Sequence, residues 1–219
     1  MRRSSESSRC VGLFFSILLF AACAAPSSSS FTSNMQSGQF RQDQILHGRA
    51  LVVSHACGDC HGGGSNPAAL GWLDGVRSPV LDQQFFQIGP FTTRAKNLTP
   101  DNATGTGRFT ERQIFNALRY GLRPEETADV EITSTVPGQG NFPLHPHYLA
   151  IPMPWPSWRH MPDQDLWAIA AYLKSLKPSN HKVQDSDGPP DFWASEYTVE
   201  KIGPYPAVPY PTANEKGQH

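Results

Sequence analysis

The chain has 219 residues, of which 38% are apolar, so it is long enough to bury one core and to carry appended segments. Its 18 glycines and 20 prolines indicate many loops. The formal net charge is -1 and no run of lysine or arginine stands out, so we expect no nucleic-acid partner.

The first 22 residues have the pattern of an export signal. Three arginines precede the apolar run 11–25, which is too short to span a bilayer comfortably. Within this run stands LFAAC, which is similar to the lipobox of bacterial lipoproteins, whose cysteine carries the lipid. This resemblance implies that Cys23 is lipidated and anchors an exported, periplasmic protein to the membrane. Ordinary cleavage near Ala25, which would discard Cys23, is the alternative.

The serine-rich segment 23–42 predicts a flexible tether after the signal. Helical periodicity then starts around Arg41 and extends to the first cysteine of the motif discussed below. The apolar residues that carry this period are Ile45, Leu46, Ala50, Val53 and Cys57. We therefore expect a helix that leads directly into the sequence SHACGDCHGG.

Two more helices are predicted further along the chain. Over 110–121, Thr110 and Gln113 form a capping box and Gly121 closes the helix. In PDQDLWAIAAYLKSLKP, Pro162 stands at the start, acidic residues follow in the first turn and lysines lie near the end. Loop-rich segments separate the helices, and continuous strand alternation is lacking. The sequence therefore predicts an all-α fold with long loops.

Cys57, Cys60 and His61 form a C-x-x-C-H motif. A structural zinc site needs four ligands, and no second cysteine pair accompanies His145 and His147. Thiol exchange favours a pair at a helix start after a strand, whereas this pair follows a predicted helix. Covalent haem attachment fits best, with two thioether bonds and His61 binding iron through Nε2. The export signal agrees, because c-type haem is attached outside the cytoplasm.

At these residues the chain resembles the class I cytochrome c family, and the resemblance covers a haem domain at 43–178. GRALVVSHACGDCHGG is similar to the family's first helix and haem site, and DLWAIAAYLKSL to its last helix. In the family a glycine of the first helix packs beneath an aromatic residue of the last, and Gly48 and Tyr172 hold these places. The block NLTPDNATGTGRFTERQIFNALRYGLRP is similar to the cytochrome domains that accompany bacterial membrane-bound alcohol and sugar dehydrogenases.

The resemblance implies a second axial ligand from a proline-rich loop ahead of the last helix. Met153, which is followed by proline, fits that pattern, and methionine sulfur favours ferrous iron and raises the potential. An open site remains an alternative, as do three other side chains. They are Met161, His145 and His147.

The separation between His61 and Met153 is longer than in small members of the family. The extra length falls at about 65–96 and 124–150, and we expect loop insertions there. Between the two insertions stands the turn sequence NLTPD. Asn97 and Thr99 of this turn either contact a haem propionate or only shape the turn.

The expected function is one-electron transfer by one covalently bound haem c with His61 and Met153 as axial ligands. The protein would act as a tethered carrier or as the cytochrome subunit of a dehydrogenase. Its partners would be redox proteins, with a dehydrogenase as donor or an oxidase or another cytochrome as acceptor. No catalytic constellation is expected, since the chain has neither a second C-x-x-C-H nor a G-x-S-x-G or P-loop sequence. A haem enzyme or gas sensor with an open or displaceable sixth ligand is the alternative.

The C-terminal extension 179–219 is rich in proline and aromatic residues. It either lies across a partner or wraps its own haem domain. From the sequence, removal of 185–219 is expected to weaken partner docking and to leave the haem spectrum unchanged.

Overall fold

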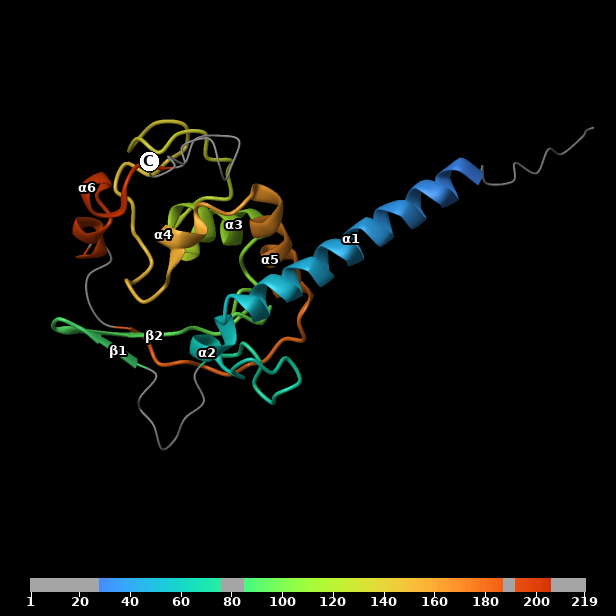
Figure 1. Ribbon diagram of the computed structural model, residues 1–219, viewed down its shortest axis with the longest axis horizontal. Coiled ribbons are helices and arrows are strands. Elements are labelled where there is room, and N and C mark those ends of the chain that lie inside the picture. Colours follow the sequence, from blue (N-terminus) through green and yellow to red (C-terminus); the bar gives the residue numbers. More distant parts are fainter. Residues whose placement is uncertain (1–27, 76–84, 187–191, 206–219) are drawn as a thin grey trace, which may run out of the picture. The chain divides into compact units, whose positions relative to one another are not determined.

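The computed structural model describes residues 28–75, 85–186 and 192–205 (Figure 1). The chain divides into two compact units, Met1–Ser37 and Gly38–His219, and the C-x-x-C-H motif belongs to the second. No described helix is both long enough and apolar enough to cross a membrane. The predicted export signal and Cys23 lie outside the described residues, so lipidation stays a prediction.

Helix α1 (Ser28–Ser54) begins well before the expected start around Arg41. Residues 28–42 are therefore helical where the sequence led us to expect a flexible tether. The physical reason is that no proline lies between residues 27 and 56. Once the packed part of a helix has formed, each added residue gains a hydrogen bond for the two dihedral angles it fixes.

Helix α3 (Glu111–Tyr120) confirms the predicted capping box. The backbone N–H of Gln113 donates to Thr110 Oγ1 over 3.2 Å, and the N–H of Thr110 donates to Gln113 Oε1 over 3.1 Å. The helix ends at Gly121, whose φ of 71° lies in the left-handed region that glycine adopts without strain. The two ends of α3 are thus set by its own sequence.

The core forms where α1, α3 and helix α5 (Asp163–Ser175) pack together. Gly48 of α1 lies directly against α5, because a Cβ there would overlap the backbone of Ala168 and stand 2.9 Å from Tyr172 Cβ. The two helices therefore cross as the family resemblance implied. The buried side chains of this core cluster are Val52, Trp72, Leu73, Ile114, Phe115, Leu118, Leu166, Ile169, Ala170, Tyr172 and Leu173.

The fold is not purely α-helical. Strands β1 (Phe85–Ile88) and β2 (Phe91–Arg94) form an antiparallel hairpin in which Ile88 pairs with Phe91. The all-α prediction is wrong for this first insertion. A two-residue connection with Gly89 at a φ of 58° joins strands of only four residues, too short for the alternation that a sequence scan detects.

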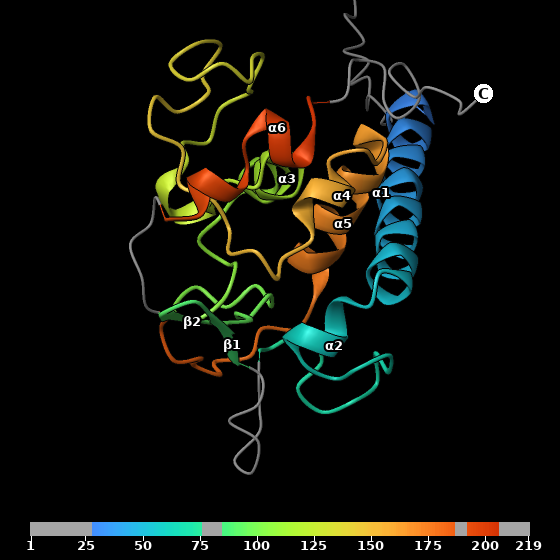
Figure 2. The same ribbon diagram turned by 60° about the vertical axis from the view of Figure 1, so that its left-hand side comes forward.

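The described part of the C-terminal extension packs on its own haem domain. Residues 179–186 run beside β2 and the turn that follows it (Figure 2). Further on come two short helices, η3 (Phe192–Glu196) and α6 (Val199–Ile202). This second stretch joins a separate buried cluster with Leu122, Ile132, Phe142, Tyr148 and Trp155, to which it adds Trp193, Tyr197 and Tyr205.

Candidate haem site

The three motif residues come from a single helical turn, α2 (Cys57–His61). Ala56 separates α1 from α2 with a left-handed φ of 55°, which redirects the chain between the two helices. The loop after α2 then folds back, because the N–H of Gly75 donates to the carbonyl of His61 over 2.8 Å. Gly62 permits this approach, since a Cβ there would lie 2.6 Å from the Gly75 carbonyl oxygen.

Cys57 and Cys60 form no disulfide, and both have intermediate burial. Burial raises the pKa of Cys57 to about 11, and burial together with the charge of Asp59 raises the pKa of Cys60. Before haem is attached, both thiols are therefore protonated at neutral pH. A thiol-exchange enzyme depends on a cysteine whose pKa is lowered, so the structure gives that alternative no support.

His61 is 9% exposed, and its Nδ1 lies 2.7 Å from the carbonyl oxygen of Lys96. A carbonyl oxygen can only accept, so Nδ1 carries the proton and Nε2 keeps its lone pair. Burial lowers the pKa of His61, which also favours the neutral ring. A neutral imidazole whose second nitrogen donates to a backbone carbonyl is the state in which histidine binds metal ions.

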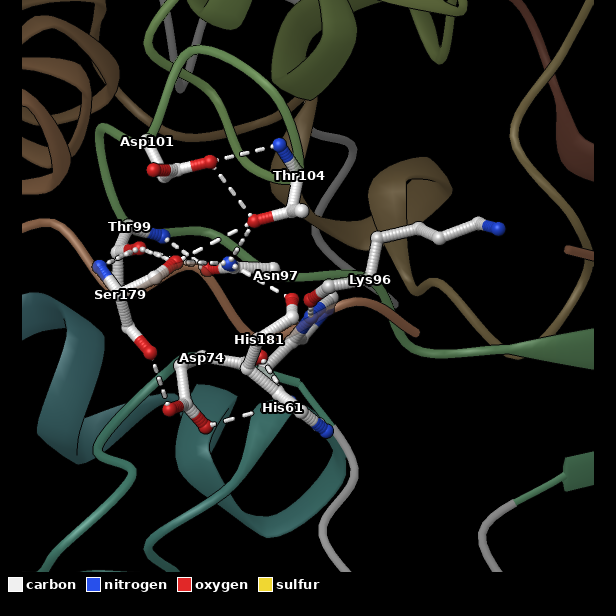
Figure 3. A network of polar contacts seen from close by, with 9 residues as sticks. All are labelled: His61, Asp74, Lys96, Asn97, Thr99, Asp101, Thr104, Ser179 and His181. Carbon is white, nitrogen blue, oxygen red and sulfur yellow. Dashed lines mark hydrogen bonds and ion pairs between the residues drawn. The ribbon is translucent and has the colours of Figure 1, made fainter. Parts of the chain in front are cut away.

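The Lys96 carbonyl is held in place by the residue that follows it (Figure 3). The buried amide of Asn97 donates to the carbonyl oxygens of Ser179, over 2.7 Å, and of His181, over 3.2 Å. Its Oδ1 accepts from the backbone and the hydroxyl of Thr99. Asn97 and Thr99 therefore shape the turn and bind the extension. These contacts favour a structural role in the turn over contact with a haem propionate.

A buried carboxylate fastens the extension to the loop after α2. Asp74 is 1% exposed, and its Oδ2 accepts from the hydroxyl of Ser179 over 2.7 Å. Its backbone carbonyl accepts from Nδ1 of His181 over 2.8 Å. We call this polar assembly, residues 57–75, 93–106 and 179–186, the proximal side.

Met153 lies in the tight turn between Ala150 and helix α4 (Trp155–Trp158). Its N–H donates to the Ala150 carbonyl over 3.0 Å, and its own carbonyl accepts from the N–H of Trp155 over 2.9 Å. The side chain is partly buried against the core cluster, which Cys57 also contacts. Met161 packs against the same cluster, so the choice of Met153 as ligand stays a prediction.

The two histidines of the second insertion serve other contacts or face solvent. His147 forms an ion pair with Glu126 through Nδ1, and His145 is exposed. Across residues 28–75, 85–186 and 192–205, no group of three or more His, Cys, Asp and Glu side chains could hold a metal ion.

Two buried arginines that bind the chain around the junction of α4 and α5 were not assigned a site from the sequence. Arg119 of α3 donates to the carbonyl oxygen of Met161 over 2.9 Å and pairs with Asp163. Arg159 follows α4 and donates to carbonyl oxygens of the extension. For Arg119 a weak signal existed, because it stands four residues after Phe115 on the buried face of α3. We call residues 119–161 and 192–205 the distal side.

Paired thiols and a buried, neutral histidine on one helical turn, beside crossed terminal helices, define the haem-attachment site of a c-type cytochrome. Comparison with known proteins agrees. Residues 45–177 match the Cytochrome c family, so the chain belongs to that family. Its cofactor is accordingly a covalently bound haem c, and the motif Cys57–His61 accounts for one such group.

Similar proteins are cytochrome subunits of bacterial dehydrogenases. The chain is 32% identical to the gluconate 2-dehydrogenase cytochrome c subunit of Pantoea cypripedii, covering 62% of this chain and 27% of that subunit. It is 27% identical to the cytochrome c subunit of alcohol dehydrogenase (quinone) from Gluconacetobacter polyoxogenes, and the match covers 62% of this chain and 22% of that subunit. It is 24% identical to the fructose dehydrogenase cytochrome subunit of Gluconobacter japonicus, and the match covers 61% of this chain and 22% of that subunit. The chain thus spans only about a quarter of the length of these curated relatives.

Proposed function

We propose that this protein transfers single electrons through a haem c whose axial ligands are His61 and Met153. The observation that carries the proposal is the 2.7 Å hydrogen bond from His61 Nδ1 to the Lys96 carbonyl, because it leaves Nε2 available for iron. The residues present fit the group, since Cys57 and Cys60 offer two thiols on the same turn as His61. When bound, haem c supplies a reversible one-electron change at its iron.

The protein's own residues tune that change. The hydrogen bond to Lys96 orients the imidazole of His61 and raises its basicity as a ligand. A methionine sulfur on the opposite face is soft and neutral and favours the ferrous state. The core cluster, which includes partly buried Met153, limits the access of water to the site.

The dehydrogenase relatives support a role as a cytochrome subunit or as a tethered carrier that takes electrons from a dehydrogenase. We further propose that the protein is exported and held at the membrane by lipid on Cys23, because LFAAC is similar to a lipobox. Fractionation tests this anchor. The wild type should sediment with membranes and Cys23→Ala should be released. Equal distribution of the two proteins would refute the anchor.

An optical spectrum of the purified holoprotein tests the ligand set. We expect a low-spin haem in both oxidation states and, in the ferric form, the weak charge-transfer band of a methionine–iron bond. Met153→Ala should abolish this band and let the ferrous protein bind carbon monoxide. Met161→Leu is the matched control and should keep the band, because it removes a sulfur at the same core cluster.

Two results would contradict the proposal. Loss of the band in Met161→Leu would move the distal ligand to that residue. A high-spin wild type that binds carbon monoxide readily would favour a haem enzyme or gas sensor with an open sixth site.

A further inference from the structure

We propose that Arg159 and residues 192–205 clamp the loop that carries Met153, and thereby determine how readily the sixth ligand leaves the iron. Arg159 acts as a positioning residue in this proposal, which rests on Met153 being the distal ligand. The C-terminal extension then has a role in ligation, whereas the sequence led us to expect an unchanged haem spectrum after its removal.

The first observation is the enclosure of Trp155, two residues after Met153. Its side chain is completely buried. The ring stacks on Tyr148 with centroids 5.7 Å apart, and Tyr197 of the extension approaches at 4.8 Å. Gly121 also lies directly against the indole, because a Cβ at this position would overlap the ring. Movement of Trp155 therefore disturbs its contact with Tyr197 of the extension.

The second observation is the position of Arg159, which is 1% exposed. Its Nη2 donates to the carbonyl oxygen of Gly203 over 3.2 Å and also to that of Ile202. The guanidinium lies over the ring of Tyr205 at 5.2 Å. A single buried cation thus joins the end of the Met153 loop to three residues of the extension.

The loop is also held from the opposite direction. Arg119 of α3 donates to the carbonyl oxygen of Arg159, so the backbone at this point is fixed to the core. A further hydrogen bond joins the Tyr197 hydroxyl to the carbonyl oxygen of Leu149, over 3.0 Å, just before Met153. The extension therefore grips the loop at both ends, at Leu149 and at Arg159.

Met153 can leave the iron only if its loop moves, and that movement must break the contacts that the extension makes with it. Hydrogen bonds from a buried cation are among the strongest of these contacts, because the cation has little water to replace its protein partners. Weakening the clamp should thus raise the population of protein with a free sixth position.

Imidazole binding to the ferric holoprotein measures this population directly, because imidazole occupies the sixth position only after methionine has left. We expect Arg159→Met to bind imidazole roughly tenfold to a hundredfold more tightly, the change produced when one or two charged hydrogen bonds are lost. Tyr197→Phe removes one neutral hydrogen bond and should give roughly a fivefold change. Arg159→Lys keeps the charge without the forked geometry and should fall between wild type and Arg159→Met.

Arg112→Met is the matched control. Arg112 lies on α3 and, like Arg159, places its guanidinium over an aromatic ring, 5.5 Å from the centre of Trp167, but it makes no described contact with the Met153 loop. Imidazole affinity should equal that of the wild type. If Arg159→Met yields no holoprotein, Tyr197→Phe decides the test, because its ring and packing are retained.

The outcomes separate the clamp from the proposed function. If the wild-type band is present and Met153→Ala loses it, but Arg159→Met and Tyr197→Phe bind imidazole like the wild type, only the clamp is overturned. If the wild type has no methionine–iron band, both proposals fail together. Tighter imidazole binding in both variants, with Arg112→Met unchanged, supports the clamp.

Discussion

The proximal and distal sides of this cytochrome are built from different interactions. On the proximal side, short polar side chains form a network that ends at one atom, the Lys96 carbonyl oxygen that accepts from His61 (Figure 3). On the distal side, stacked aromatic rings and two buried arginines surround a loop. The described hydrogen bonds and ring contacts of the distal side hold the neighbours of Met153, whose own side chain packs against the core cluster.

The difference separates two ways of presenting a ligand. The proposed ligand His61 is held by a hydrogen bond to its own ring, which sets the orientation and the protonation of the imidazole. The direction of that bond therefore matters more than the volume of the surrounding groups. Packing around a loop sets only where Met153 can go, so the volume of the enclosing groups matters more. The proximal side should therefore respond to the loss of single donors or acceptors, and the distal side to changes of shape.

The largest effect is expected for Gly121→Ala, which tests the distal side by shape. The new Cβ would overlap the ring of Trp155 and would also meet its Nε1 at 2.6 Å, while the residue keeps a left-handed φ. Overpacking and backbone strain together should lower the free energy of unfolding by about 3 kcal/mol. The methionine–iron band should weaken while the haem stays attached. Denaturant unfolding and the optical spectrum provide the two measurements.

Gly89→Ala is the matched control for this variant. Gly89 also has a left-handed φ, but nothing lies within 4 Å of the position its Cβ would take. It should therefore lose only the strain contribution, about 1 kcal/mol, and keep the band. Equal losses of unfolding free energy in the two variants would show that Trp155 moves aside at no cost and that the distal side tolerates changes of shape.

A smaller effect is expected for Asp74→Ala on the proximal side. The change removes the acceptor of the Ser179 hydroxyl in a buried setting and should lower the free energy of unfolding by about 2 kcal/mol. Amide hydrogen exchange over 179–186 should accelerate, while the methionine–iron band stays intact because Met153 is held elsewhere. Loss of the band would mean that the two sides are coupled.

Asp185→Ala is the control for the same segment. The Asp185 side chain is 90% exposed, and its one ion pair among the described residues joins it to Lys96 Nζ over 3.4 Å. Exposed ion pairs of this kind contribute little, so unfolding and hydrogen exchange should match the wild type. A loss comparable to that of Asp74→Ala would point to general loosening of the extension.

Features that depend on neighbouring residues could be predicted from the sequence. The motif at Cys57–His61, the capping box of α3 and the closure at Gly121 are each specified within a few positions of the chain. The crossing of α1 and α5 at Gly48 came from the family resemblance and is confirmed. Such local patterns point to His61 as the proposed proximal ligand and specify most of the helical core.

Contacts with backbone carbonyl oxygens could not be predicted, because every residue offers the same acceptor. Arg159 reaches Ile202, and His61 reaches Lys96, without any residue type that marks the partner. The hairpin around Gly89 was missed for another reason, since four-residue strands carry too little alternation. The packing of the extension on Trp155 likewise depends on residues far apart in the sequence.

The smallest expected effect concerns alkaline pH and again distinguishes the two sides. Burial raises the pKa of Tyr197 to about 12, whereas an unfolded chain ionises tyrosine near pH 10. Between these values the unfolded state has released the proton and the folded state has kept it, so stability is full below about pH 10 and falls as the pH rises toward 12. Because the side chain is only partly buried, solvent screening reduces this contribution to about 1 kcal/mol. Unfolding measured from pH 9 to pH 12 should thus show a shallower decline for Tyr197→Phe than for the wild type. Asp74→Ala, which alters no tyrosine, should decline as steeply as the wild type. A parallel decline for all three proteins would show that Tyr197 is not the source of the alkaline sensitivity.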